Sequence, residues 1–163
     1  MSFSYTLPPF PPASQGNASR AALVGQIDAA FGRDIWLDLA NPGPDREPYV
    51  PPTQSGDVLL IEGREALRQA VIRRIITDPG EWSTLPEYGI GASRYVRGKA
   101  NAATIDELKA RIRTQLLRDP RIYSVDQVAT EVSDGGLKIF IRITPKGERR
   151  TDGARLDVDI TIV

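Results

Sequence analysis

Hydrophobic residues recur at helical spacing in two segments, 64–77 and 104–118. A stripe of apolar side chains at every third or fourth position is typical of a helix that buries one face. Pro79-Gly80 follows the first segment and Asp119-Pro120 follows the second, and proline cannot continue either helix. The faces predicted to be buried contain Leu67, Val71 and Ile75 in the first helix, and Ile105, Leu108, Ile112 and Leu116 in the second.

The start of the second helix is predicted from a capping pattern. Thr104-Ile105-Asp106-Glu107 places a threonine three residues before a glutamate, as in a capping box. We therefore expect Thr104 to cap the helix and Glu107 to reach back to it.

Strict alternation of apolar and polar residues predicts three strands near the end of the sequence. Ser133-Asp134-Gly135-Gly136 predicts a hairpin turn between the first two strands. Three half-buried antiparallel strands on two main helices predict a two-layer α+β fold. The alternating positions are Val128, Thr130 and Val132, then Leu137, Ile139, Ile141 and Ile143, and finally Leu156, Val158, Ile160 and Ile162.

Weaker patterns precede these elements. Ala21 to Phe31 predicts a short helix interrupted by Gly25, and Ile35 to Leu39 alternates like a strand that ends at Asn41-Pro42-Gly43-Pro44. Val58 to Ile61 predicts another short strand or a turn.

Proline and charge divide the 163-residue chain. Nine of the 13 prolines lie in residues 1–57, which carry a net charge of −3, whereas residues 58–163 carry +3. We predict a Pro-rich extended arm over 1–22, an N-terminal extension and loop over 23–57, and a folded core over 58–163. In the arm, Leu7 and Phe10 are the apolar residues that would anchor it on a partner.

Composition excludes several chemistries. The chain has no cysteine and no histidine, so it has no disulfide, no zinc–thiolate site and no Ser-His-Asp triad. The formal net charge of zero argues against nucleic-acid and anionic-membrane binding. We see no signal peptide and no apolar run long enough to span a membrane, so we expect synthesis in the cytoplasm. We also expect that the protein binds no cofactor.

Carboxylates are the remaining candidates for catalysis. Glu81 and Glu87 flank Trp82 and Tyr88, which would suit a peptidoglycan hydrolase with two acids and an aromatic sugar platform. The alternative is a loop that packs Trp82 and Tyr88 while both acids are solvated, and we favour it. Scattered aspartates without calcium-loop spacing predict caps and turns rather than metal ligands; they are Asp57, Asp78 and Asp119.

The corner Asp119-Pro120-Arg121 permits two interpretations. Arg121 could brace the junction between helix and strand, or it could form a two-pronged anchor for a carboxylate of a partner. The last strand also permits two interpretations: it is an open edge for a partner's strand, or it lies centrally in the sheet. In the first case Leu156, Val158, Ile160 and Ile162 belong to the partner-binding strand.

Several of these segments together resemble the W/25-like baseplate wedge family, the sheath initiators of contractile tails. The resemblance covers residues 31–163 and rests on a helix ending in Thr77, on Pro79-Gly80-Glu81, on Leu85 to Gly89, and on Asp119-Pro120-Arg121 before the sheet. The family pattern has glutamate where this chain has Asp119.

The resemblance implies a structural role without catalysis. Its members sit in the baseplates of contractile phage tails, type VI secretion systems and extracellular contractile injection systems, in six copies. They bind wedge proteins and initiate the sheath, whose strands add to their sheet. By resemblance, Asp119, Pro120 and Arg121 matter for this junction. The N-terminal arm lies outside the resemblance, and proteins of the central spike, hub or tube are the candidate partners for it. We expect the protein in an assembled virion or injection particle.

Overall fold

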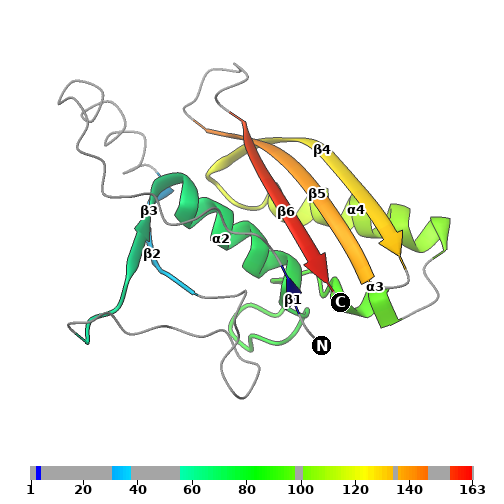
Figure 1. Cartoon of the computed structure of the whole chain (residues 1–163), viewed down its shortest axis with the longest axis horizontal. Coiled ribbons are helices and arrows are strands. Elements are labelled where there is room, and N and C mark those ends of the chain that lie inside the picture. The colour runs from blue at the N-terminus through cyan, green and yellow to red at the C-terminus, as the bar shows by residue number, and fades with distance from the viewer. Residues whose placement is uncertain are drawn as a thin grey trace. The chain divides into compact units, whose positions relative to one another are not determined.

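The computed structural model describes residues 3–4, 31–37, 56–97, 101–133, 136–146 and 155–162. The chain divides into two compact units, one made of Met1–Ser4 with Ala70–Val163 and the other of Tyr5–Gln69. The elements, labelled in Figure 1, are β1 (Phe3–Ser4), β2 (Arg33–Ile35), β3 (Leu60–Glu62), α2 (Gly63–Ile76), α3 (Ser93–Arg97), α4 (Ala102–Leu116), β4 (Ile122–Ser133), β5 (Gly136–Pro145) and β6 (Leu156–Ile162).

The larger unit is built on an antiparallel sheet with the strand order β1-β6-β5-β4. In Figure 1, α4 runs across one face of β4, β5 and β6. The other face carries mostly polar side chains, among them the exposed Lys138, Asp157 and Asp159. The alternation in the sequence explains this division, because a strand with period-two hydrophobicity can bury only one face. The predicted α+β fold with three antiparallel strands is therefore confirmed.

The core of this unit contains the residues that the two periodicities selected. In α4, Leu108, Ile112 and Leu116 are fully buried, and Ile105 is half-buried. In the sheet, the apolar residues of β5 and β6 on the face towards the core are at most 3% exposed. They are Leu137, Ile139, Ile141, Ile143, Leu156, Val158, Ile160 and Ile162.

The predicted start of the second helix is wrong by two residues. α4 begins at Ala102, and its cap is Asn101 rather than Thr104. The Asn101 side chain accepts the N–H of Thr104 at 2.9 Å, and the Thr104 hydroxyl accepts the N–H of Asn101 at 3.0 Å. Thr104 therefore takes the third helical position of the capping box, the place that we had assigned to Glu107.

In the smaller unit, β2 and β3 form an antiparallel pair. The strand predicted over 35–39 lies earlier, at Arg33–Ile35. The buried Gln69 explains why the chain leaves the ladder: its side chain accepts the N–H of Leu37 at 2.9 Å and donates to the carbonyl of Ile35 at 2.8 Å. The predicted apolar run 58–61 forms β3 at Leu60–Glu62. Residues 21–30 and 38–44 lie outside the described residues.

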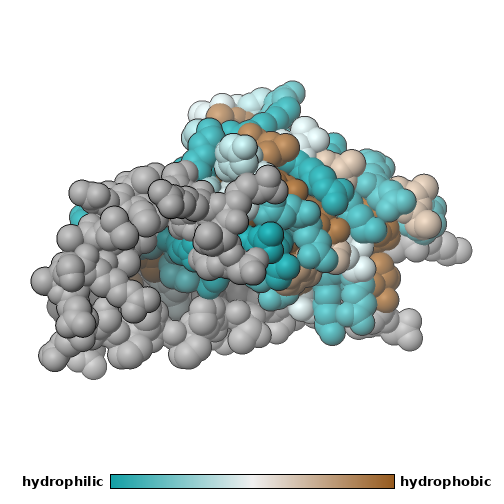
Figure 2. Space-filling model, turned by 90° about the horizontal axis from the view of Figure 1, so that it is seen from above, coloured by the Kyte–Doolittle hydropathy of each residue, from teal (hydrophilic) through white to brown (hydrophobic). Residues whose placement is uncertain are grey.

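The described surface mixes hydrophobic and hydrophilic residues. On the face shown in Figure 2, brown hydrophobic residues appear between teal hydrophilic ones. None of the helices among the described residues is long and apolar enough to cross a membrane. The larger unit nevertheless exposes several large apolar side chains, namely Trp82, Leu85, Leu117, Tyr123 and Val132.

Candidate functional site

An ion pair within the chain holds the corner between α4 and β4. Arg121 places its Nε 2.9 Å from Oδ1 of Asp119 and its Nη2 2.7 Å from Oδ2, and its backbone N–H donates to Oδ1 at 3.0 Å. Asp119 is only 5% exposed. The turn between the two elements, closed by Ile122 N–H donating to the Asp119 carbonyl, brings these side chains together. Both oxygens of the carboxylate are thus engaged inside the chain.

Arg74 adds a second positive charge to this corner. Its Nη1 donates to the carbonyl of Gln115 at 3.0 Å, and its Nη2 lies 3.9 Å from Oδ2 of Asp119. Burial by itself raises the pKa of the Asp119 carboxyl. Hydrogen bonds from Arg121 and the charges of Arg121 and Arg74 outweigh burial, so this pKa lies below its ordinary value.

We expect the stability that Asp119 contributes to be lost in acid. Its pKa is lower in the folded chain than in the unfolded chain, so the contribution is complete above the unfolded value of about 3.9 and is lost as the pH falls through the folded value. The difference in unfolding free energy between wild type and Asp119→Asn, measured by urea unfolding, should therefore be constant near neutrality and shrink below about pH 4. A difference independent of pH would contradict this assignment.

The loop after α2 contains the two glutamates considered for catalysis. Glu81 Oε2 accepts the backbone N–H of Asp78 at 2.8 Å, and Glu87 Oε2 lies 3.1 Å from Nη2 of Arg118. Both glutamates are exposed, whereas a general acid in glycoside hydrolysis is kept protonated by an apolar surrounding. Glu81 thus caps a turn and Glu87 forms a surface ion pair.

The aromatic residues of this loop stack on one another. The rings of Trp82 and Tyr88 lie 4.9 Å apart with 6° between their planes, and the guanidinium of Arg74 lies 4.7 Å from the Tyr88 ring centroid. Burial raises the pKa of Tyr88, against the opposing charges of Arg74 and Arg73. The two rings thus cover one another and do not lie side by side as a platform.

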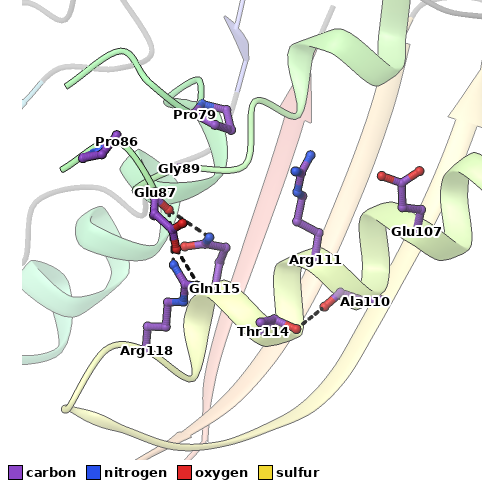
Figure 3. A pocket seen from close by; sticks show the side chains of 10 residues that line it. All are labelled: Pro79, Pro86, Glu87, Gly89, Glu107, Ala110, Arg111, Thr114, Gln115 and Arg118. Carbon is purple, nitrogen blue, oxygen red and sulfur yellow. Dashed lines mark hydrogen bonds and ion pairs between the residues drawn. The ribbon is translucent and has the colours of Figure 1, made fainter. Parts of the chain in front are cut away.

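A cavity of about 590 Å³ lies between this loop and α4 (Figure 3). Glu107 and Arg111 project into it from α4, and Gln115 and Arg118 reach Glu87 on the opposite wall. The cavity thus combines Glu87 with Glu107, not with Glu81. Its charged side chains have both signs, and two of them, Glu87 and Arg118, pair with each other.

The four apolar residues predicted to form a partner-binding strand are not on the surface. Leu156, Val158, Ile160 and Ile162 are buried in the core beneath β6. β6 instead presents backbone N–H and C=O groups on the side away from β5. There β1 pairs with only two residues, Phe3 opposite Ile162 and Ser4 opposite Thr161. Among the described residues, no strand pairs with β6 from Leu156 to Ile160 on this side.

The register shows which backbone groups lie at that outer edge. Next to the ladder that pairs β5 with β4, the N–H of the even-numbered Lys146 donates to the Arg121 carbonyl at 2.8 Å. Even-numbered residues of β5 therefore point their N–H and C=O groups towards β4, and odd-numbered ones towards β6. Since Ile139 is opposite Ile160, the backbone groups of Asp157 and Asp159 point outward.

Sequence reasoning missed these outward groups and the contribution of Arg74. The alternation in β6 together with the hairpin at residues 133–136 contained the signal for the first. No local signal pairs Arg74 with Asp119, which is 45 positions later in the sequence. Leu7 and Phe10 lie outside the described residues.

Metal binding finds no support in the described part of the chain. No group of three or more His, Cys, Asp or Glu side chains lies together in it. Asp78 instead accepts a hydrogen bond from Nε of Arg94 at 3.1 Å.

Comparison with known proteins gives a family and similar solved structures. Residues 45–148, more than half of the chain, match the family described as contractile injection system sheath initiator. A solved structure from Geobacter sulfurreducens, named as a tail lysozyme, is 20% identical with a TM-score of 0.49, over 60% of this chain and 87% of that chain. No curated protein matches this chain.

Proposed function

The chain belongs to the sheath-initiator family of contractile injection systems, and from this premise we propose that it starts sheath assembly by adding a strand of a sheath subunit to the outer edge of β6. The family has a structural role in these machines and associates with sheath and baseplate components. We further propose that the chain joins the wedge proteins to the sheath.

The observation that supports this proposal is the outward backbone of Asp159. This residue presents one N–H and one C=O on the side away from β5, and an added strand would bond both groups. Two net hydrogen bonds would contribute about 1–3 kcal/mol before the cost of ordering the strand. A free-energy gain of this size is enough to direct where the sheath starts to polymerise, because further subunits then add to the first one.

The two edges of the sheet are not equivalent, and β6 is the better template. β5 and β6 pair over seven residues without a shift in register. β4, at the opposite edge, has irregularities between Ile122 and Ser124 and between Val125 and Gln127. Bulges twist an edge away from further pairing, so they protect β4 at that end.

The side chains next to the edge also favour an added strand. Asp157 is held by Arg142, with Nε 2.7 Å from Oδ1 and Nη2 2.9 Å from Oδ2, while the Arg142 guanidinium lies 5.4 Å from the Phe140 ring centroid. This fork fixes the strand at its open edge. Asp159 is exposed beside it, so an incoming strand with a basic residue opposite Asp159 would gain a cross-strand pair.

Asp159→Pro tests the proposal because it removes one outward N–H. The pairing with β5 is untouched, since proline is tolerated on an edge strand where its nitrogen faces outward. In particles purified from cells that carry this variant, we expect at least a tenfold fall in the fraction of tails with attached sheath, counted by electron microscopy.

Asp159→Ala is the matched control, because it removes the same carboxylate and keeps the N–H. It should lose at most about 1 kcal/mol of cross-strand interaction and remain sheathed. Circular dichroism should show that both variants fold. Sheathed tails at the wild-type frequency with Asp159→Pro would rule out strand addition at this edge. Deleting residues 154–163 is a poorer test, because it would remove four core side chains.

A further inference from the structure

The segment from Gly80 to Glu87 is exposed at every residue, yet it is held in one conformation. Gly80 N–H donates to the Pro86 carbonyl at 2.9 Å and closes the base of the loop. Leu85 N–H donates to the Trp82 carbonyl at 3.0 Å, and Tyr88 N–H to the Leu85 carbonyl at 2.9 Å. A loop that is already ordered loses little conformational entropy when it binds.

Side chains from the end of α4 and from the turn after it fix the same loop from its flank. Gln115 Nε2 donates to the Glu87 carbonyl at 3.0 Å, and Arg118 pairs with the Glu87 carboxylate. Behind the loop, Arg74 covers Tyr88 and is tied in turn to Gln115 and Asp119. The stack of Arg74, Tyr88 and Trp82 therefore connects the buried corner to an exposed indole.

Trp82 and Leu85 are the large apolar side chains that this loop exposes. Trp82 is 39% exposed although Tyr88 covers one face of its ring, and Leu85 is 51% exposed. While they are exposed, the isolated chain lacks the stabilisation that burial of their apolar surface would give, about 25 cal/mol per Å². Tryptophan on a rigid support is the residue type that most often dominates protein–protein interfaces.

The charges of the loop are used within the chain. Glu81 caps the N–H of Asp78, and Glu87 pairs with Arg118. The tip between them, Trp82 to Leu85, carries no charge. Such a surface complements an apolar pocket rather than a phosphate backbone or a charged strand.

We propose that this loop is a preformed knob that inserts Trp82 and Leu85 into an apolar pocket of a baseplate protein other than the sheath. The proposal rests on the proposed function, and it adds a second contact to that of the β6 edge. The knob holds the chain in the baseplate, while β6 receives the sheath. The two surfaces have different chemistry, so one substitution need not damage both.

The test uses assembled particles from cells that carry Trp82→Ala, Leu85→Asp, or the control Tyr123→Ala. Tyr123 is 61% exposed, so the control removes an aromatic that is more accessible than Trp82. We expect each loop variant to lower the amount of this chain per particle at least tenfold by quantitative mass spectrometry, with the control unchanged. Leu85→Asp retains the Trp82–Tyr88 stack, and thermal melting should show that it folds. Wild-type amounts of Leu85→Asp in particles would overturn the proposal.

A photoreactive benzoylphenylalanine at position 85 identifies what lies in contact. The expected product in assembled particles is a cross-link to a baseplate protein. Cross-links to the sheath, to a second copy of this chain, or to nothing would each overturn the proposal. If loop variants assemble normally while Asp159→Pro loses the sheath, only the knob is wrong. If loop variants are lost while Asp159→Pro keeps the sheath, only strand addition at β6 is wrong.

Discussion

Arg121→Ala is expected to lower the free energy of unfolding by about 2–3 kcal/mol. The substitution leaves the buried Asp119 carboxylate without its two-pronged partner, and Arg74, 3.9 Å away, compensates only in part. Urea unfolding followed by circular dichroism measures the loss. Adding Asp119→Asn to the same chain should recover part of it, because the uncompensated charge is then absent.

An equivalent pair on the surface provides the control for this prediction. Arg142 forks onto Asp157 with similar distances, but its partner's side chain is 44% exposed compared with 6% for Asp119. Arg142→Ala should therefore cost no more than about 1 kcal/mol. Unchanged stability of Arg121→Ala together with loss of sheath from particles would mean that Arg121 anchors a partner and does not brace the corner.

Gly89→Ala is expected to be at least as destabilising, by about 3 kcal/mol or more. Gly89 has a φ of +97°, and a Cβ there would lie 2.3 Å from the backbone carbonyl oxygen of Thr77. That oxygen already accepts the N–H of Gly91 at 2.8 Å, so it cannot move without breaking the turn. Thermal and urea unfolding of the variant measure the effect, and the knob should lose its fixed conformation as well.

Gly80→Ala separates the backbone strain of a positive φ from the steric clash of the added Cβ. Gly80 has a similar φ of +85°, but no atom lies within 4 Å of its Cβ position. It should therefore cost only the conformational preference, about 1–2 kcal/mol. Equal losses for the two variants would show that the contact with Thr77 contributes nothing.

Much of the fold was predictable because its signals are local. Leu67, Val71 and Ile75 lie on one face of α2, and the alternation of Leu137 to Ile143 identifies a strand with one buried face. The cap at Asn101 was missed because two overlapping patterns compete there, and helix capping depends on which of them the backbone satisfies. The resemblance to sheath initiators was confirmed by the family match, since it rested on the order of several short motifs.

The candidate sites could be predicted only in part. The sequence indicated that Asp119 and Arg121 act together, because they are two residues apart, but it left open whether their partner was internal. It selected β6 but assigned partner binding to Leu156 and Val158, whose side chains lie in the core. Their alternation determined that one face is buried, and it cannot say which neighbour a strand has on each side.

By itself, the sequence thus determined the two main helices, the three long strands, their buried faces and the absence of histidine and cysteine chemistry. Only the tertiary structure decided that Arg74 joins Asp119 to Tyr88, that Trp82 caps this stack, and that the backbone of Asp159 points away from β5. The physical reason is the separation along the chain over which each kind of interaction acts. Periodicity and capping act within a few residues, whereas ion pairs, ring stacks and strand neighbours join positions whose separation in the chain leaves no local pattern.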